Sequence, residues 1–155
     1  MDYKIENFIY DLEANLKANL TSYIDAINTA NGDSLLEAFA DESYFIQTLD
    51  ERVANYNQFI ILQAGNPALN SGLGGAVALT YPLAVYLSFD AGNSDVGAKR
   101  LFRYLDALME CVMENFWKVS SKKFLISGVD QMALIDIDKS KRVVATGITL
   151  EVSFG

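Results

Sequence analysis

The sequence predicts an α+β fold in a single domain over residues 1–155: a four-stranded, mostly antiparallel sheet with two long helices packed on one face. Three observations lead to this prediction. Two segments repeat apolar residues at spacings of three and four, which is typical of amphipathic helices. The C-terminal segment alternates apolar and small or polar residues, which is typical of a half-buried strand. Shorter apolar runs bounded by turn residues complete the order helix, strand, strand, helix, strand, strand.

The first helix is expected from about Tyr3 to Ala30, ahead of the sequence "NGD". Asn-Gly favours a positive φ and therefore ends a helix. The apolar stripe of this helix is more typical of core packing than of a partner site. Its members are Ile5, Phe8, Ile9, Leu12, Leu16, Leu20, Tyr23, Ile24 and Ile27.

The middle of the chain predicts an irregular connection and then two strands. Residues 33–56 have a mixed period and are expected to cross a sheet edge irregularly. The run Phe59 to Leu62, ended by Gly65, predicts a buried strand. Ala76 to Phe89 predicts the next strand, which we expect to run antiparallel to the first. Pro82 cannot donate to a ladder and predicts a bulge or an edge position.

The second helix is expected in "AGNSDVGAKRLFRYLDALMECVMENFWKVS", ending near Trp117. Three good N-cap residues, Asn93, Ser94 and Asp95, precede it. Its predicted stripe consists of Leu101, Leu105, Leu108, Val112 and Phe116, widened by Phe102, Met109 and Met113.

The C-terminal third predicts one or two strands broken near Gly128, a turn at "KSKR" and a last strand. In that strand one parity is apolar and expected to be buried: Val144, Thr146, Ile148, Leu150, Val152 and Phe154. The other parity is expected to be wet or to form an interface: Ala145, Gly147, Thr149, Glu151 and Ser153.

Composition excludes several kinds of chemistry. The chain has no histidine and a single cysteine, Cys111, so a His/Cys zinc site, a Ser-His-Asp triad and a Cys-His pair are all excluded. Cys111 is expected to be a buried small hydrophobe. The net charge of −8 disfavours tight nucleic-acid binding, but it suits a passage through which nucleic acid slides without sticking.

The glycine-rich stretch "NPALNSGLGG" resembles a phosphate-binding loop only superficially. A P-loop needs a Lys after the last glycine and a helix after the loop, whereas a strand is expected here. A dinucleotide fingerprint needs a third glycine at the right spacing. The sequence therefore favours a loop of about ten residues between two strands, long enough to contact a neighbouring subunit.

The carboxylates give no specific signature. Asp41–Glu42 and Asp50–Glu51 are adjacent pairs, and Asp136 and Asp138 have the i, i+2 spacing of calcium loops. The glycine and the terminal Glu of such a loop are absent, so "DIDKSKR" is interpreted as a solvated hairpin turn. We expect no cofactor, no metal and no catalytic residue, and the protein is not expected to be an enzyme.

The order of elements resembles the tail terminator (tail-completion) family of tailed-bacteriophage neck proteins. The resemblance covers nearly the whole chain and rests on the strand with "YP", the helix with "RLFRYLDAL" and the last strand with "ATGITLEV". It implies a structural virion protein that forms a ring, usually a hexamer. The ring would cap the tail tube and join it to the head–neck connector, while DNA passes through the lumen without sequence-specific binding.

The resemblance also implies where contacts form and where the protein is found. The loop and the last strand supply the candidate interaction residues: Asn66, Asn70, Gly72, Leu73, Gly74, Gly75, Thr149 and Glu151. The expected location is the virion neck, after assembly in the bacterial cytoplasm, with no membrane partner. Two alternatives stay open: another head–tail joining or adaptor protein of similar fold, and a small nucleotide-binding domain that uses Gly72–Gly75.

Overall fold

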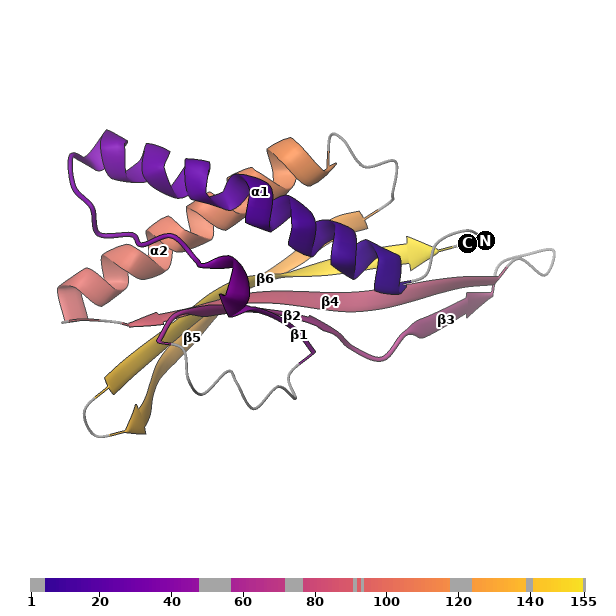
Figure 1. The fold of residues 1–155 in the computed structure, drawn as a ribbon. Helices are drawn as coiled ribbons and strands as arrows, with labels where there is room; N and C mark the ends of the chain where they lie inside the picture. Colours follow the sequence, from indigo (N-terminus) through magenta and orange to yellow (C-terminus); the bar gives the residue numbers. More distant parts are fainter. Residues whose placement is uncertain are drawn as a thin grey trace.

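A computed structural model describes residues 5–47, 57–71, 77–90, 92, 94–117, 124–138 and 141–154 (Figure 1). Two long helices, a short 3₁₀ turn, a π-helical segment and six strands make up these residues. In chain order they are α1 (Ile5–Asn31), η1 (Asp41–Ser43), β1 (Tyr44–Ile46), β2 (Phe59–Ala64), β3 (Ala68–Ser71), β4 (Val77–Asp90), α2 (Ser94–Cys111), η3 (Val112–Trp117), β5 (Phe124–Asp138) and β6 (Lys141–Phe154).

The predicted four-stranded, mostly antiparallel sheet is wrong: the sheet has six strands and is mixed. Its order is β1-β2-β4-β6-β5, with β3 paired to β4 off this path. β2, β6 and β3 run antiparallel to β4, whereas β1 runs parallel to β2. β1 has only three residues, too few to show a period, and β3 lies in a segment of turn-forming composition. Long-range pairing to neighbouring strands creates both, which a local pattern does not record.

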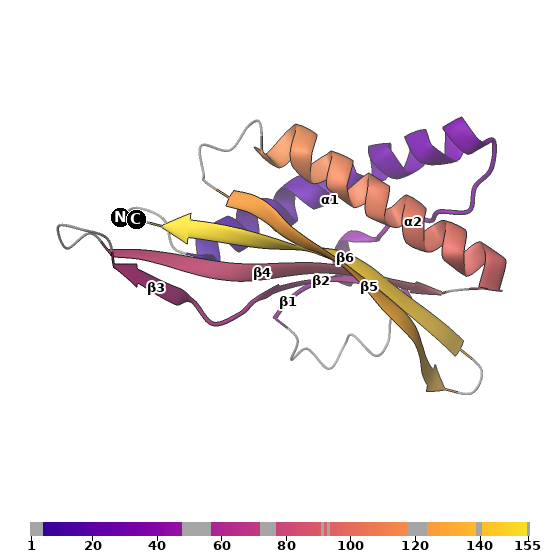
Figure 2. The same cartoon turned by 180° about the vertical axis from the view of Figure 1, so that it is seen from behind.

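Both helices lie on one face of the sheet, and Figures 1 and 2 show this layer from opposite sides. The core between the layers contains the predicted stripe of α1, of which Phe8, Ile9, Leu12, Leu16, Leu20 and Ile24 are buried. Leu83, Val85, Leu87 and Phe89 of β4 face them, together with Ile148, Leu150 and Val152 of β6. The predicted alternation of the last strand is confirmed at Thr146, which is also buried, and at Glu151 and Ser153, which are exposed. It is wrong at Gly147, which is buried, while Thr149 is half-buried.

The end of α1 has the expected cause. Gly32 has φ +65°, and its N–H donates to the Thr29 carbonyl at 3.1 Å, while the Asp33 N–H donates to the Asn28 carbonyl at 3.1 Å. This is the Schellman arrangement, which satisfies carbonyls left over at a helix C-terminus.

The buried face of helix α2 differs from the apolar stripe that was predicted for it. Leu105, Leu108 and Val112 are buried as expected, but Phe102 is 55% exposed and Met113 is 39% exposed. Tyr104 is buried instead, because it lies about 200° around the helix from Phe102. The chain stays helical up to Trp117, as predicted, although it changes from α to π geometry at Val112.

The connection from α1 to the sheet is irregular over residues 34–40, as predicted, and side chains fix its course. Asn28 makes two hydrogen bonds to the Leu36 backbone, donating to its carbonyl and accepting from its N–H. The Tyr104 hydroxyl does the same for Glu37, at 2.8 and 2.9 Å, and Arg100 donates to the carbonyls of Leu35 and Asp90. The predicted irregular stretch is wrong over Asp41–Ile46, which form η1 and β1, and its residues 48–56 lie outside the described residues.

Two hairpins project from the body of the sheet (Figures 1 and 2). β3 and β4 extend past the N-terminal end of α1, and the paired ends of β5 and β6 extend away from the helix layer on the other side. β5 is one strand, with a register shift between Ile126 and Gly128 where a break was predicted. Asp138 pairs with Lys141, which together with Arg142 belongs to β6, and residues 139–140 of the predicted "KSKR" turn lie outside the described residues.

Candidate interaction surface

Part of the predicted loop of about ten residues is a strand. Ala68–Ser71 form β3 and pair antiparallel with Val77–Thr80, so the candidate residue Asn70 lies in the sheet opposite Ala78. Asn66 is exposed in the short link between β2 and β3. The candidates Gly72, Leu73, Gly74 and Gly75 lie outside the described residues. The structure therefore brings part of the candidate loop into a paired hairpin.

The two candidates on the last strand lie on the sheet face away from the helices. Thr149 pairs with Ala84 of β4, and the exposed Glu151 pairs with Pro82. Asn70 and Thr149 are separated along β4 by six residues, because their partners are Ala78 and Ala84. The structure thus places the candidates on one sheet but does not gather them into a single cluster.

Pro82 lies where β2 stops and β3 begins. Ala64, the last residue of β2, pairs with Leu83, and Ala68, the first of β3, pairs with Thr80. Between them Gly65 donates its N–H to the Pro82 carbonyl at 2.7 Å. Of the two alternatives predicted at Pro82, the bulge is wrong, since β4 and β6 stay in continuous register there. The other, an edge position, holds locally, because neither β2 nor β3 has a residue paired with Pro82. The missing N–H is accommodated instead by the interruption of the neighbouring strand.

A Cβ on Gly65 would lie 2.9 Å from Cγ of Pro82, so the chain packs tightly at this break. The neighbouring residues Asn66, Pro67 and Ala68 are all exposed. The break therefore redirects the chain from the covered part of the sheet to the projecting hairpin.

Sequence reasoning did not single out the two apolar side chains that the sheet leaves most exposed. Leu69 of β3 is 67% exposed and Val129 of β5 is 46% exposed. Phe102, Tyr10 and Met113 are the other exposed large apolar residues among the described ones, and all three are on the helices. The alternation of β5 and β6 could have indicated Val129, whereas Leu69 needs β3 to be known first.

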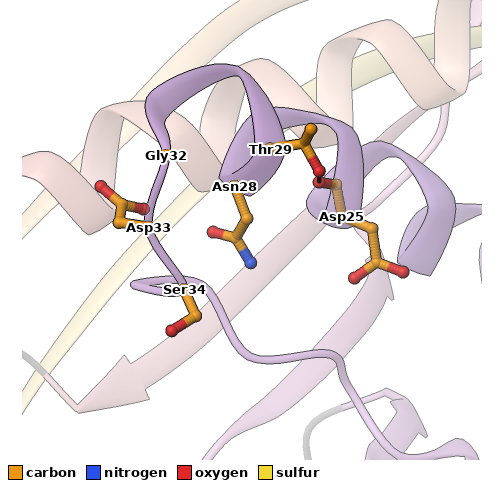
Figure 3. Close-up of a pocket in the computed structure, with 6 residues that line it drawn as sticks. All are labelled: Asp25, Asn28, Thr29, Gly32, Asp33 and Ser34. Atoms are coloured by element: carbon orange, nitrogen blue, oxygen red, sulfur yellow. Dashed lines mark hydrogen bonds between the residues drawn. The ribbon is translucent and has the colours of Figure 1, made fainter.

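One open pocket lies at the end of α1, lined by Asp25, Asn28, Thr29, Gly32, Asp33 and Ser34 (Figure 3). Its polar groups serve the fold. Asn28 holds the Leu36 backbone, and the Thr29 hydroxyl donates to the Asp25 carbonyl at 2.9 Å. Asp33 accepts from the Leu35 N–H at 3.3 Å and from Arg103 at 2.9 Å. The pocket is therefore explained by the turn that leaves the helix.

Asp33 gives a prediction for the dependence of stability on pH. Its hydrogen bond from Arg103 is the largest cause that lowers the pKa of its carboxyl below the ordinary value of 3.8. A lowered folded-state pKa stabilises the fold above pH 3.8, and this contribution is lost as the pH falls through the lowered value.

We expect Asp33→Asn to be less stable than the parent at neutral pH, with the difference shrinking in acid below that value. Urea unfolding at several pH values measures this difference. Asp25→Asn, in the same pocket, is the control. A difference that persists unchanged in acid would show that the Arg103 contact does not act through the charge of Asp33.

A buried thiol and two hydrogen bonds to Tyr23 of α1 lie where α2 continues into η3. Cys111 is buried, as predicted, and burial is the largest cause that raises the pKa of its thiol to about 12. Close by in sequence, Glu114 accepts a hydrogen bond from the Tyr23 hydroxyl at 2.7 Å, and Asn115 donates to the same hydroxyl at 2.7 Å. These contacts join α1 to the π-helical segment. The raised pKa makes the thiol a poor nucleophile at neutral pH.

The described Lys and Arg side chains of α1 and α2 all make ion pairs or hydrogen bonds within the protein. Lys17 pairs with Glu13, Lys99 with Asp95 and Arg103 with Asp33. Arg100 donates to two backbone carbonyls. Several carboxylates on the same helices are exposed, among them Glu6, Asp25, Asp106 and Glu110. The surface of the helix layer is therefore predominantly anionic.

Among the residues that the structure describes, no helix is long and apolar enough to cross a membrane. Within the same residues, no group of three or more His, Cys, Asp or Glu side chains lies together as a metal ion would require. No protein-family model matches the chain, and no curated protein matches it.

Proposed function

We propose that this chain is a structural subunit of the neck of a tailed bacteriophage, namely a tail terminator. Its copies form a ring, a hexamer by the resemblance, that caps the tail tube and joins it to the head–neck connector. DNA passes through the lumen of this ring. The sequence resemblance in the "RLFRYLDAL" and "ATGITLEV" segments is the starting point of the proposal.

The observation that carries the proposal is the projecting β3–β4 hairpin. It extends past the helices, and its Leu69 is 67% exposed, the highest value among the exposed large apolar residues described. Single exposed apolar side chains are common on protein surfaces, but one on a projecting strand is placed where a neighbouring subunit could cover it. The net charge of −8 and the anionic helix layer also favour a lumen that does not hold DNA.

Capping of tail tubes tests the proposal. We expect the protein, added to tail-tube protein of the same phage, to bind one end of each tube and stop its elongation. Negative-stain microscopy gives the distribution of tube lengths. Leu69→Asp should lose capping while keeping its fold, whereas the control Tyr10→Asp, at a residue that is 54% exposed on α1, should cap normally. Tubes that elongate equally with and without the protein would exclude a terminator.

Two other functions would give different experimental results. A head–tail joining protein of similar fold would bind neck components but leave tube elongation unchanged. A nucleotide-binding domain is disfavoured because the glycine segment joins two paired strands, β3 and β4, and not a strand and a helix. If the chain did bind a nucleotide, a nucleotide concentration one hundred times the Kd would raise the free energy of unfolding by about 2.7 kcal/mol.

A further inference from the structure

Beyond the end of β1, the side chain of Gln47 closes the edge of β2. β1 ends at Ile46, and the following Gln47 has φ +59°. Its N–H donates to the Leu62 carbonyl at 2.8 Å, and its Oε1 accepts from the Ala64 N–H at 2.8 Å. The Gln47 amide thereby takes the place that another strand residue would occupy beside β2. This arrangement protects the edge from pairing with another chain.

The edge of β3 has no such protection. Ala68–Ser71 pair with β4 on one side, and no other described strand pairs with them. Ala68 and Leu69 are exposed, and the strand contains no charge and no proline. Charges, prolines and bulges are the usual means by which proteins prevent edge pairing. Among the described strands, none pairs with the outer side of β3, so this edge can accept an extended strand.

The opposite edge of the sheet is β5, and it offers one regular window. Register shifts fall between Ile126 and Gly128 and between Met132 and Ile135, and between them Gly128–Met132 pair continuously with β6. Bulges hinder pairing on either side of this window. Within it lies Val129, which is 46% exposed. The length of the window suits the four residues of β3.

Leu69 and Val129 lie on the same face of the sheet. Leu69 pairs with Leu79, which pairs with Phe154, and Val129 pairs with Ile148. Phe154 and Ile148 are six residues apart on β6, so both positions face the helix side. Leu69 and Val129, which lie in register with them, therefore point to the helix side as well. If β3 of one copy lay beside β5 of another, these two exposed side chains would meet on one continuous face and shield each other from water.

We propose that copies of this chain associate head to tail, with the edge of β3 in one copy paired to the Gly128–Met132 window of β5 in the next. Leu69 then packs against Val129 of the neighbouring copy. The inference rests on the proposed ring, because a contact between two different surfaces of the same chain generates a ring when its rotation closes. Pairing of backbone groups supplies affinity, and the Leu69–Val129 contact sets the register.

Disulfide trapping tests this contact. We expect the double variant Leu69→Cys with Val129→Cys to give, on mild oxidation, a series of covalent dimers, trimers and higher species on a non-reducing gel. The two single variants mixed together should stop at the dimer, and each single variant alone should give no cross-link. The native Cys111 is fully buried and does not compete. The matched control pairs Leu69→Cys with Tyr10→Cys and should not form the series.

Four results would overturn the contact. Cross-linking of Leu69→Cys with itself would indicate two β3 edges paired symmetrically. An equal series from the control pair would indicate collisions only. A ring seen by mass photometry without any cross-link in the double variant would leave the proposed function standing and place the subunit contact elsewhere. Absence of any ring would remove both proposals. Circular dichroism melts matching the parent ensure that every variant is folded.

Discussion

Gly147→Ala should unfold this protein more readily than any other small substitution in its strands. A Cβ added at Gly147 would overlap the Val85 carbonyl oxygen and would lie 2.7 Å from Cδ1 of Tyr86. Gly147 pairs directly with Tyr86 across β4 and β6, so the ring occupies the space that a side chain would need. A glycine inside a strand often marks such a close approach of another backbone.

The clash cannot be relieved by a rotamer change, because the closest atom belongs to the backbone of β4. β4 is held between β2 and β6, so shifting it breaks pairing on both sides. We expect a loss of about 3 kcal/mol or more in the free energy of unfolding, at the upper end for overpacking. Urea unfolding measures this loss through the midpoint at constant m-value.

Gly128→Ala is the matched control for this substitution. Gly128 also lies in a strand, one strand further along the sheet, and a Cβ there meets nothing within 4 Å. We expect a change within about 0.5 kcal/mol. Equal stability of the two variants would mean that β4 and β6 do not approach each other in the register described above.

Phe8→Ala is the second substitution with a large expected effect. Phe8 is fully buried in the core between α1 and the sheet. Removal of a buried phenyl ring costs both its transfer free energy and the cavity that remains, typically about 3–5 kcal/mol. The expected result is a loss of that size in urea unfolding, together with a lower Tm.

Tyr10→Ala, two residues further on the same helix, is the control that distinguishes the effect of lost burial from the effect of changed helix propensity. Tyr10 is 54% exposed, so we expect a change within about 0.5 kcal/mol. A similar loss at both positions would mean that the face of α1 turned to the sheet is not the one that contains Phe8.

The sequence predicted the helices and the last strand because each has its own period. The stripe of α1 matches the buried residues, and the Gly32 turn ends it where Asn-Gly indicated. β6 alternates as predicted because one face meets the helices while the other does not. Such faces are set by local spacing, so an amphipathic pattern is sufficient to predict them.

The strands β1 and β3 could not be predicted in the same way. Each is short and exists because a longer neighbour offers free backbone groups: β2 for Tyr44–Ile46, and the N-terminal half of β4 for Ala68–Ser71. The error at Phe102 has a similar origin. Tyr104 takes the buried position because its hydroxyl reaches the Glu37 backbone, a long-range contact that hydrophobicity alone does not record.

The candidate interaction residues were predicted from a resemblance, and only some lie among the described residues. Thr149 and Glu151 lie on the sheet face away from the helices, and Asn70 lies in a strand. The two exposed large apolar residues of the sheet, Leu69 and Val129, were missed because their exposure depends on which strands form the sheet edges.

The mass of the assembled protein in solution tests the ring most directly. Mass photometry over a range of concentrations should give one discrete species at a whole-number multiple of the 17.1 kDa chain, with few species between it and the monomer. A closed ring produces this distribution because the last contact formed is intramolecular. A protein that stays at 17.1 kDa at every concentration, also in the presence of tail tubes, would contradict the ring and the function proposed for it.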